Sequence, residues 1–223
     1  MRKHFDLIAR RAAKQVRKSY PRTLAIAVDG SVGRGQPGPH SDIDTFVLVK
    51  PGKKPEPFSY FDRGCYVGVG FETAGKKAHK DPMDFYWARG GAFSARILYD
   101  PKGVLKRRIG SLRRSQPTTR MIENALWEAY HNIIEYAGKL RNGRVSGDEY
   151  LIRYAARIIA GRAEEAVIVL NNLSPGSENV VWHQVMAARK KPKHFRVDYP
   201  LAGGIRGSER VDQVFSSALR LAR

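Results

Sequence analysis

The stretch that decides the fold is GSVGRG, residues 30–35, followed after a short loop by SDID, residues 41–44. A β-rich run at 23–29 leads into Gly30, and a second β-rich run begins at Ile43. Glycine lets the backbone turn tightly, so that amide groups and the Ser31 hydroxyl can approach phosphate oxygens closely. The pattern therefore predicts a phosphate-holding turn between two strands.

Two carboxylates stand at the start of the second run. Asp42 and Asp44 flank Ile43, and period-two alternation places both on one face while Ile43 turns into the core. Mg²⁺ usually takes one or two carboxylates and completes its shell with substrate phosphates and water. Metals so placed can bridge the attacking and leaving oxygens of a phosphoryl or nucleotidyl displacement. The alternative is a plain surface turn, but the order of the two motifs, each at a strand edge, favours a phosphate and metal site.

The segments around this motif predict two domains. Residues 3–18 have the apolar stripe of an amphipathic helix, and the strand-like runs are 23–29, 43–50, 65–72 and 95–99. Helical periodicity dominates after about residue 115, where Ser146 and Glu149 form a capping-box pattern before a second long helix. Shorter helices are expected at about 178–190 and 208–222. We expect an α+β fold, with a mixed-sheet domain at 1–115 and an all-α helical-bundle domain at 116–223.

Composition limits the class of protein and its partners. The chain has 223 residues, of which 40 are Lys or Arg and 21 are Asp or Glu, so its formal net charge is +19. This excess predicts polyanionic partners such as nucleotides or nucleic acid. No apolar run approaches the roughly 20 residues of a membrane span, and no signal peptide is evident, so a cytoplasmic protein without a membrane partner is expected. Cys65 is the single cysteine, which excludes an internal disulfide, and we expect it to be a small buried apolar residue.

Two further motifs complete a resemblance to a known family. The Gly-Ser turn and the Asp-x-Asp pair are followed by ILYDP at 97–101 and by EYAGKLRN at 135–142. In this order and spacing, the chain resembles the DNA polymerase β-type nucleotidyltransferase superfamily and, more narrowly, the kanamycin nucleotidyltransferases. The resemblance covers about residues 25–175 and leaves the tail after about 176 unmatched. It implies that residues 1–115 form the catalytic domain of an enzyme that transfers NMP, as AMP from ATP, to a hydroxyl acceptor and releases pyrophosphate.

The resemblance also implies a role for each matched residue. The residues that would bind the nucleotide are Gly30, Ser31, Arg34, Ser41 and Lys139. Asp42 and Asp44 would bind Mg²⁺ (or Mn²⁺). Glu135 would accept the proton of the acceptor hydroxyl. A homodimer is expected by the same likeness. For Glu135 and Lys139, the helical pattern alone favours a purely structural interpretation. The two residues stand at i and i+4, where they can form a solvent-exposed salt bridge.

The chain departs from the family pattern at one metal position. The family supplies a third carboxylate on a following strand, where this chain has Gly68. Glu72 shares the strand face of Gly68, but four residues place it roughly 13 Å further along. A bulge at a strand glycine could shorten that gap, so Glu72 is kept as a third candidate metal ligand. Asp84, expected in the following loop, is a weaker candidate.

The charge balance bears on the acceptor and on a second function. An aminoglycoside is a polycation, which a +19 protein repels at long range, and His131 stands four residues before Glu135. The acceptor is therefore expected not to be a polycation. Basic residues cluster in the N-terminal helix, at Lys106–Arg114 and at Arg189–Arg196, and such clusters bind RNA or DNA phosphates without sequence preference. The alternative function is a catalytically weakened nucleotide-binding protein that holds RNA or DNA on this basic surface.

Overall fold

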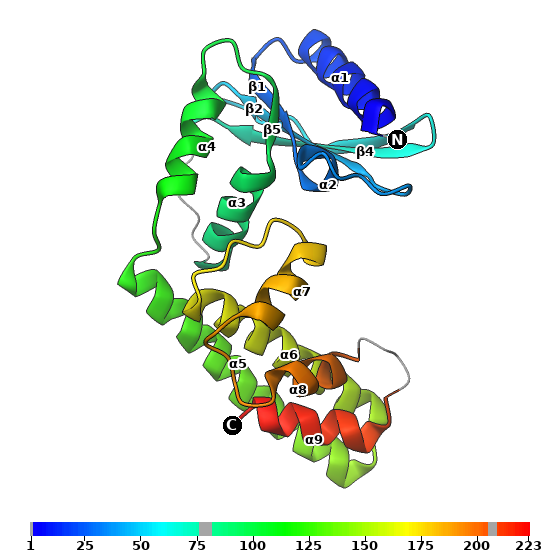
Figure 1. The fold of residues 1–223 in the computed structure, drawn as a ribbon, viewed down its shortest axis with the longest axis vertical. Helices are drawn as coiled ribbons and strands as arrows, with labels where there is room; N and C mark the ends of the chain where they lie inside the picture. Colours follow the sequence, from blue (N-terminus) through cyan, green and yellow to red (C-terminus); the bar gives the residue numbers. More distant parts are fainter. Residues whose placement is uncertain (1, 76–81, 205–208) are drawn as a thin grey trace. The chain divides into compact units, whose positions relative to one another are not determined.

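The chain folds into two compact units, each with its own core (Figure 1). The computed structural model describes residues 2–75, 82–204 and 209–223. One unit comprises Met1–Lys80 with Trp87–Gln116, and the other comprises Asp81–Tyr86 with Pro117–Arg223. Within the described residues, no helix is both long and apolar enough to span a membrane.

A five-stranded mixed sheet forms the centre of the first unit. Its strand order is β3-β4-β2-β1-β5. The strands are β1 (Thr23–Val28), β2 (Ile43–Val49), β3 (Phe58–Asp62), β4 (Cys65–Thr73) and β5 (Arg96–Tyr99). Strands β2 and β4 are parallel, whereas the other neighbouring pairs are antiparallel. The mixed sheet followed by a helical part confirms the predicted α+β fold.

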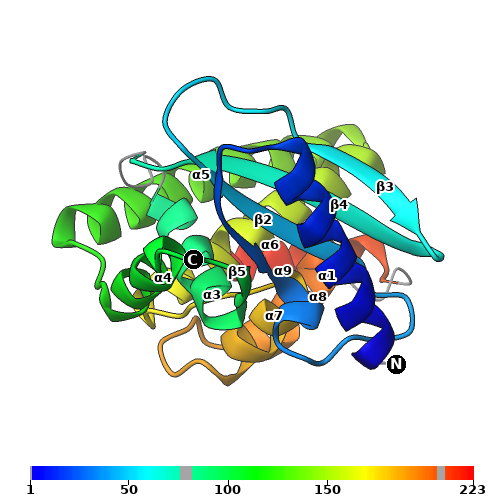
Figure 2. The same cartoon turned by 90° about the horizontal axis from the view of Figure 1, so that it is seen from above.

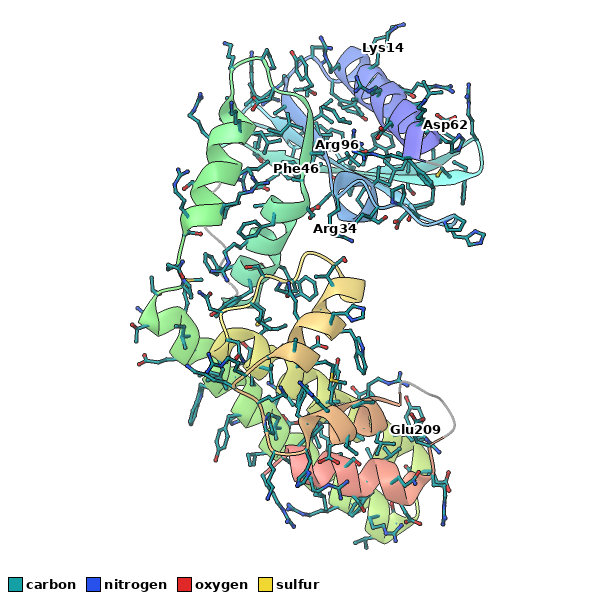
Figure 3. The ribbon with its side chains drawn as sticks, viewed as in Figure 1. Lys14, Arg34, Phe46, Asp62, Arg96 and Glu209 are labelled. Atoms are coloured by element: carbon teal, nitrogen blue, oxygen red, sulfur yellow. The ribbon has the colours of Figure 1, made fainter. Side chains whose placement is uncertain are left out.

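Helices cover the two faces of this sheet differently. Helix α1 (Arg2–Ser19) lies along one face (Figure 2). Its Phe5 and Ile8 belong to the same buried cluster as Ile26 and Val47 of the sheet. Its exposed Lys14 points away from the sheet (Figure 3). Helices α3 (Pro82–Ser94) and α4 (Val104–Arg114) contribute to the second face, where the buried residues are Ala25, Ala27, Leu48, Ala92, Leu105 and Ile109.

Strand alternation puts the acidic motif on the second face. Leu48 packs in the α3/α4 cluster, and Asp44 has the same parity along β2, whereas Ile43 packs in the α1 cluster. Asp44 therefore lies on the face opposite to α1. Ile43 turns into the core as predicted, whereas Asp42 lies before β2, outside the strand alternation.

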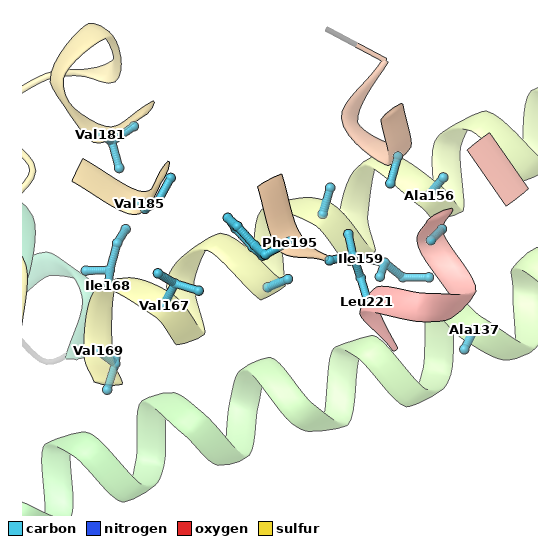
Figure 4. Close-up of a cluster of buried hydrophobic side chains, with 14 of the residues drawn as sticks. Ala137, Ala156, Ile159, Val167, Ile168, Val169, Val181, Val185, Phe195 and Leu221 are labelled. Carbon is cyan, nitrogen blue, oxygen red and sulfur yellow. The ribbon is translucent and has the colours of Figure 1, made fainter. Parts of the chain in front are cut away.

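The second unit is built almost wholly of helices. They are α5 (Thr119–Ser146), α6 (Glu149–Leu170), α7 (Glu178–Ala187), α8 (Phe195–Gly203) and α9 (Val211–Leu221). Ile159 and Val167 of α6 pack with Phe195 of α8 and Leu221 of α9 in one apolar cluster (Figure 4). Because several helices bury one face each in this cluster, the unit does not depend on α5 alone for its core.

Some local predictions were wrong or incomplete. Strand β3 and helices α3, α4 and α8 were not predicted. Asp84 lies in the first turn of α3 rather than in a loop. Ser146 is the last residue of α5, and the N-cap of α6 is Asp148, whose side chain accepts a 2.9 Å hydrogen bond from the Leu151 N–H. Asp148, the residue directly before α6, is therefore the N-cap, and Ser146 is not.

Candidate nucleotide and metal site

The Gly-Ser turn forms a short helix, α2 (Gly30–Gly33), directly after β1. Gly30 has a φ of +63°, a conformation that favours glycine. Gly33 is required for a different reason: a Cβ there would lie 2.5 Å from the Ser94 carbonyl oxygen and 2.7 Å from that of Val28. Both contacts are with backbone, so the turn fits against β1 and the end of α3 only with glycine at this position.

Two serine hydroxyls join the turn to the loop that follows it. The Ser31 hydroxyl donates a 2.9 Å hydrogen bond to the Ser41 hydroxyl oxygen, which also accepts a 2.9 Å bond from the Gly38 N–H. The Gln36 N–H donates to the Ser31 carbonyl oxygen at 2.9 Å. These bonds fix the loop against α2 and bring the Ser31 and Ser41 hydroxyls together.

The carboxylate pair lies beside the turn. A Cβ on Gly30 would come within 3.4 Å of Oδ2 of Asp44, so the glycine leaves room for this carboxylate. Partial loss of hydration raises the pKa of Asp44, and the negative charges of Asp42 and Asp29 raise it further. A bound cation would relieve this repulsion, and two carboxylates next to a phosphate site match the oxygen ligands that Mg²⁺ takes. The donor set therefore fits one magnesium ion completed by substrate phosphates.

The structure does not add Glu72 to this pair. Gly68 is the direct neighbour of Asp44 in the parallel β2/β4 register, whereas Glu72 lies beside Leu48. The Glu72 carboxylate instead forms a 2.5 Å ion pair with Arg108 of α4. In the described part of the chain, no three His, Cys, Asp or Glu side chains are grouped to hold a metal, so neither Glu72 nor Asp84 completes a three-carboxylate centre.

Asp29 is a site residue that sequence reasoning missed. Its Oδ1 accepts a 2.7 Å hydrogen bond from the Gly30 N–H and another from the Ser94 hydroxyl, and its own N–H donates to the Asp44 carbonyl oxygen at 2.9 Å. Burial raises the pKa of Asp29, although the Ser94 and Gly30 hydrogen bonds and the Arg34 charge act in the opposite direction. The available signal was an aspartate next to a Gly-Ser turn, which is a favoured helix N-cap.

Glu135 and Lys139 form a separate pair on α5 of the second unit. The Lys139 ammonium lies 2.7 Å from the Glu135 carboxylate and 4.2 Å from the centre of the Tyr136 ring. The hydrogen bond from Lys139 lowers the pKa of Glu135, and the nearby His131 adds a smaller effect of the same sign. Both side chains are open to solvent, so the pair matches the simple i, i+4 salt bridge as well as the role that the family likeness implies.

A Gly-Ser turn at the end of β1, beside carboxylates at the start of β2, is the arrangement from which the sequence predicts phosphoryl or nucleotidyl transfer. Residues 9–82, about a third of the chain, match the family model described as nucleotidyltransferase domain. This part of the chain is therefore a nucleotidyltransferase domain of the DNA polymerase β type. The narrower likeness to kanamycin nucleotidyltransferase stays a prediction.

A comparison with solved structures extends the fold across both units. A nucleotidyltransferase-like protein from Exiguobacterium sibiricum 255-15 matches 96% of this chain and 72% of its own, with a TM-score of 0.54 and 15% sequence identity. At this identity, the match concerns the fold alone. No curated protein matches the chain in sequence.

Proposed function

We propose that the protein is a Mg²⁺-dependent enzyme that transfers AMP from ATP to a hydroxyl acceptor and releases pyrophosphate. The observation that carries this proposal is the closeness of Gly30 to Asp44: a Cβ on Gly30 would lie 3.4 Å from Asp44 Oδ2, so the Gly-Ser turn lies next to a carboxylate. A nucleoside triphosphate that lies on the turn would present its phosphates to the carboxylate pair. A plain structural turn has no need for this cluster of negative charge.

Each proposed site residue of the first unit would help to bind the nucleotide or the metal ion. The Gly30 and Ser31 backbone, with the hydroxyls of Ser31 and Ser41, would hold the triphosphate, and Arg34 would add positive charge. Asp42 and Asp44 would hold Mg²⁺ (Mn²⁺ is a second suitable ion), which when bound neutralises phosphate charge and favours attack at phosphorus. Because Ser31 and Ser41 are already hydrogen-bonded to each other, little ordering of these side chains would accompany binding.

Glu135 and Lys139 would act in the transfer step. The acceptor oxygen forms a bond to the α-phosphorus, the bond from that phosphorus to the pyrophosphate oxygen breaks, and the hydroxyl proton passes to Glu135. Lys139 lowers the pKa of Glu135 while the two are paired, which makes the carboxylate a weaker base. These two roles rest on the family likeness.

The experiment that tests the function follows the label of [α-³²P]ATP. Purified protein is incubated with the labelled nucleotide, Mg²⁺ or Mn²⁺, and a cell extract that supplies acceptors. Transfer of label to an extract component, with release of unlabelled pyrophosphate, supports the enzyme. Binding of nucleotide with no transfer of label, for all four NTPs and both metals, would disprove it. Because the chain carries a net charge of +19, neutral and anionic acceptors are expected to be labelled before polycations.

The second candidate is a nucleotide-binding protein with weakened catalysis that holds RNA or DNA. Gly68 favours it, because this glycine occupies the strand position next to Asp44 and leaves Asp42 and Asp44 without a carboxylate at that position. The basic residues of α4, which end in Arg113 and Arg114, offer phosphate contacts. The active enzyme and the weakened nucleotide-binding protein differ in one respect: in the second, the absence of a carboxylate at position 68 limits the transfer reaction.

Gly68→Asp separates these candidates. A Cβ at this position would meet Asp44 Oδ1 at 3.6 Å, an ordinary contact, so the new carboxylate fits beside the pair. If catalysis is limited by the missing ligand, label transfer should rise by at least about tenfold and half-saturating Mg²⁺ should fall. Gly70→Asp, two residues further along the same face, is the matched control. An active wild type that gains nothing from Gly68→Asp would rule out this limitation.

A homodimer is the assembly that we propose, and helix α5 supports it. Its outward stripe carries Trp127, Tyr130 and Ile134 with 66%, 57% and 51% of their surface exposed. These residues repeat every three to four positions, on a different side of the helix from Ala125 and Ala129, which are buried. An apolar stripe of this kind on a charged protein is typical of an interface.

Ile134→Glu should therefore separate the protomers. A charge placed in an apolar interface that repeats on both subunits is expected to weaken dimerisation by at least about a hundredfold. Sedimentation equilibrium measures the change. Val197→Glu, which alters an exposed valine on α8, should leave the mass unchanged. A monomeric wild type would contradict the proposed dimer.

A further inference from the structure

A cavity of about 250 Å³ lies on the carboxylate-bearing face of the sheet, between the strands and helices α3 and α4. Its walls include the rings of Phe46 and Trp87 and the aliphatic side chains of Leu105 and Ile109. All the residues that line it belong to the first unit. Sites that enclose a drug-sized molecule span roughly 300–1,000 Å³, so this space suits a single ring with a short substituent rather than a nucleotide or an oligosaccharide.

The cavity reaches the proposed catalytic site at Asp29. This residue lines the cavity and also lines the open depression that contains Asp44 and Gly68, so the two spaces adjoin at one carboxylate. Phe46 is shared in the same way and is marked in Figure 3. A group held in the cavity beside Asp29 is therefore next to the position where a nucleotide phosphate would lie.

One oxygen of Asp29 is available to a ligand. Oδ1 accepts hydrogen bonds from the Gly30 N–H and the Ser94 hydroxyl, whereas Oδ2 accepts none from the residues that the structure describes. Oδ2 is turned toward Gly91, another cavity residue, where a Cβ would lie only 2.9 Å away. Glycine at position 91 thus leaves space in front of a partly buried acceptor. A hydrogen-bond donor in the cavity would fill that space and satisfy the oxygen.

The other end of the cavity carries two opposite charges and no net charge. Glu72 and Arg108 form their 2.5 Å ion pair there and line the wall together. Glu72 stands four strand positions beyond the neighbour of Asp44, which is roughly 13 Å along the sheet. Because the two charges neutralise each other, this end of the cavity does not strongly attract a charged ligand. The cavity as a whole combines apolar walls with one carboxylate oxygen, Oδ2 of Asp29, at the end next to the proposed catalytic site.

We propose that this cavity binds the acceptor of the reaction, and that the acceptor is a neutral, ring-containing alcohol or phenol. Its ring lies between Phe46 and Trp87, and before the nucleotide binds its hydroxyl donates to Oδ2 of Asp29. In the transfer step the proton leaves this hydrogen bond and passes to Glu135, as proposed above. The role as acceptor depends on the proposed nucleotidyl transfer, whereas the binding of such compounds does not. A polyhydroxylated cation is excluded by the apolar walls and the small volume, in agreement with the repulsion expected from the net charge.

Binding is tested without nucleotide or metal, with 4-ethylphenol and its methyl ether, 4-ethylanisole, as probes. The indole N–H signal of Trp87 is followed by ¹H–¹⁵N NMR and assigned with Trp87→Phe. We expect 4-ethylphenol to shift this signal saturably, with a dissociation constant on the order of 1 mM for so small a ligand. The ether lacks the donor and leaves Oδ2 unpaired, so it should bind about tenfold more weakly.

Three variants show whether the probe occupies this cavity. Ala88→Phe fills it from α3 and should abolish the shift, whereas Phe93→Leu, at an exposed position of the same helix, should not. Asp29→Asn replaces Oδ2 by a donor and should remove the preference for the phenol over the ether. Unchanged thermal unfolding of each variant shows that its fold is intact. Equal binding of the two probes, no saturable shift, or full binding to Ala88→Phe would overturn the proposal.

The two proposals can fail separately. Saturable phenol binding in a protein that transfers no label would leave the cavity assignment standing and count against nucleotidyl transfer. Label transfer in a protein whose cavity binds neither probe would support the enzyme and reject this acceptor site.

Discussion

Replacement of Asp44 by asparagine is expected to lower nucleotidyl transfer by at least about a thousandfold and to raise the unfolding temperature of the first unit. The loss of transfer follows because the amide removes half of the carboxylate pair that would hold the metal, and loss of an electrostatic group of this kind typically costs two to three orders of magnitude or more. The gain in stability follows from the like charges of Asp42 and Asp29, which oppose ionisation of Asp44 in the folded protein.

The pH dependence of this stability difference has a definite sign. The folded-state pKa of Asp44 is raised above the ordinary value of 3.8, so the folded protein binds the proton more tightly than the unfolded chain. The ionised carboxylate therefore destabilises the fold at pH values above the raised pKa, and this cost disappears as the pH falls toward 3.8. Asp44→Asn should be more stable than the wild type at pH 7, and this difference should shrink as the pH falls and vanish below pH 3.8.

Label transfer and thermal unfolding at the two pH values measure both effects. Asp62→Asn is the matched control, because Asp62 ends β3 and lies 3.6 Å from the Arg11 guanidinium, so its charge is compensated by an opposite charge and it belongs to no proposed metal or phosphate contact. It should retain full transfer. Substantial transfer by Asp44→Asn would reject the metal site, and a lower unfolding temperature at pH 7 would reject the electrostatic argument.

Gly33→Ala is expected to destabilise the first unit by about 2–3 kcal/mol and to weaken nucleotide binding. Its Cβ would lie 2.5 Å from the Ser94 carbonyl oxygen and 2.7 Å from that of Val28, so backbone must shift. The shift would move α2 and separate Ser31 from Ser41, and the phosphate site would lose its geometry. The loss of folding stability therefore comes from steric overlap, because the substitution removes no functional group.

Urea unfolding of the first unit and titration with ATP measure this effect. Gly110→Ala is the matched control, because this glycine lies inside α4 of the same unit and its Cβ would meet only the flexible end of Arg114, at 3.4 Å. That substitution should be neutral or stabilising by up to about 1 kcal/mol, as is usual for Gly→Ala in a helix. Similar behaviour of the two variants would contradict the close approach at Gly33.

The fold was predictable where one side of an element is buried. Helix α1 shows its stripe clearly, because Phe5, Ile8, Ala12 and Val16 all face the sheet. Helix α3 gave no such signal: its Phe85 and Tyr86 pack in the apolar cluster of the second unit, while Ala92 packs in a cluster of the first. A helix that buries residues on several sides has no periodic pattern for sequence reasoning to detect.

The site was predictable where its residues are close in the chain. Gly30, Ser31, Ser41 and Asp44 form one local motif, and the structure brings them together. Asp29 acquires its role from Ser94, which is 65 residues away, and from the burial that α3 produces. The ion pair of Glu72 similarly depends on Arg108, a residue of a helix that the sequence did not predict. Such long-range contacts are set by tertiary packing.

The glycine beside Asp44 also has a consequence at the level of the gene. A glycine codon can become an aspartate or glutamate codon by a single base change at its second position. Because the space at residue 68 accepts a Cβ at an ordinary distance from Asp44, neither the genetic code nor steric hindrance prevents a third carboxylate here. A population under selection for faster transfer could reach this variant in one mutational step, which makes Gly68 a natural first position for directed evolution of the protein.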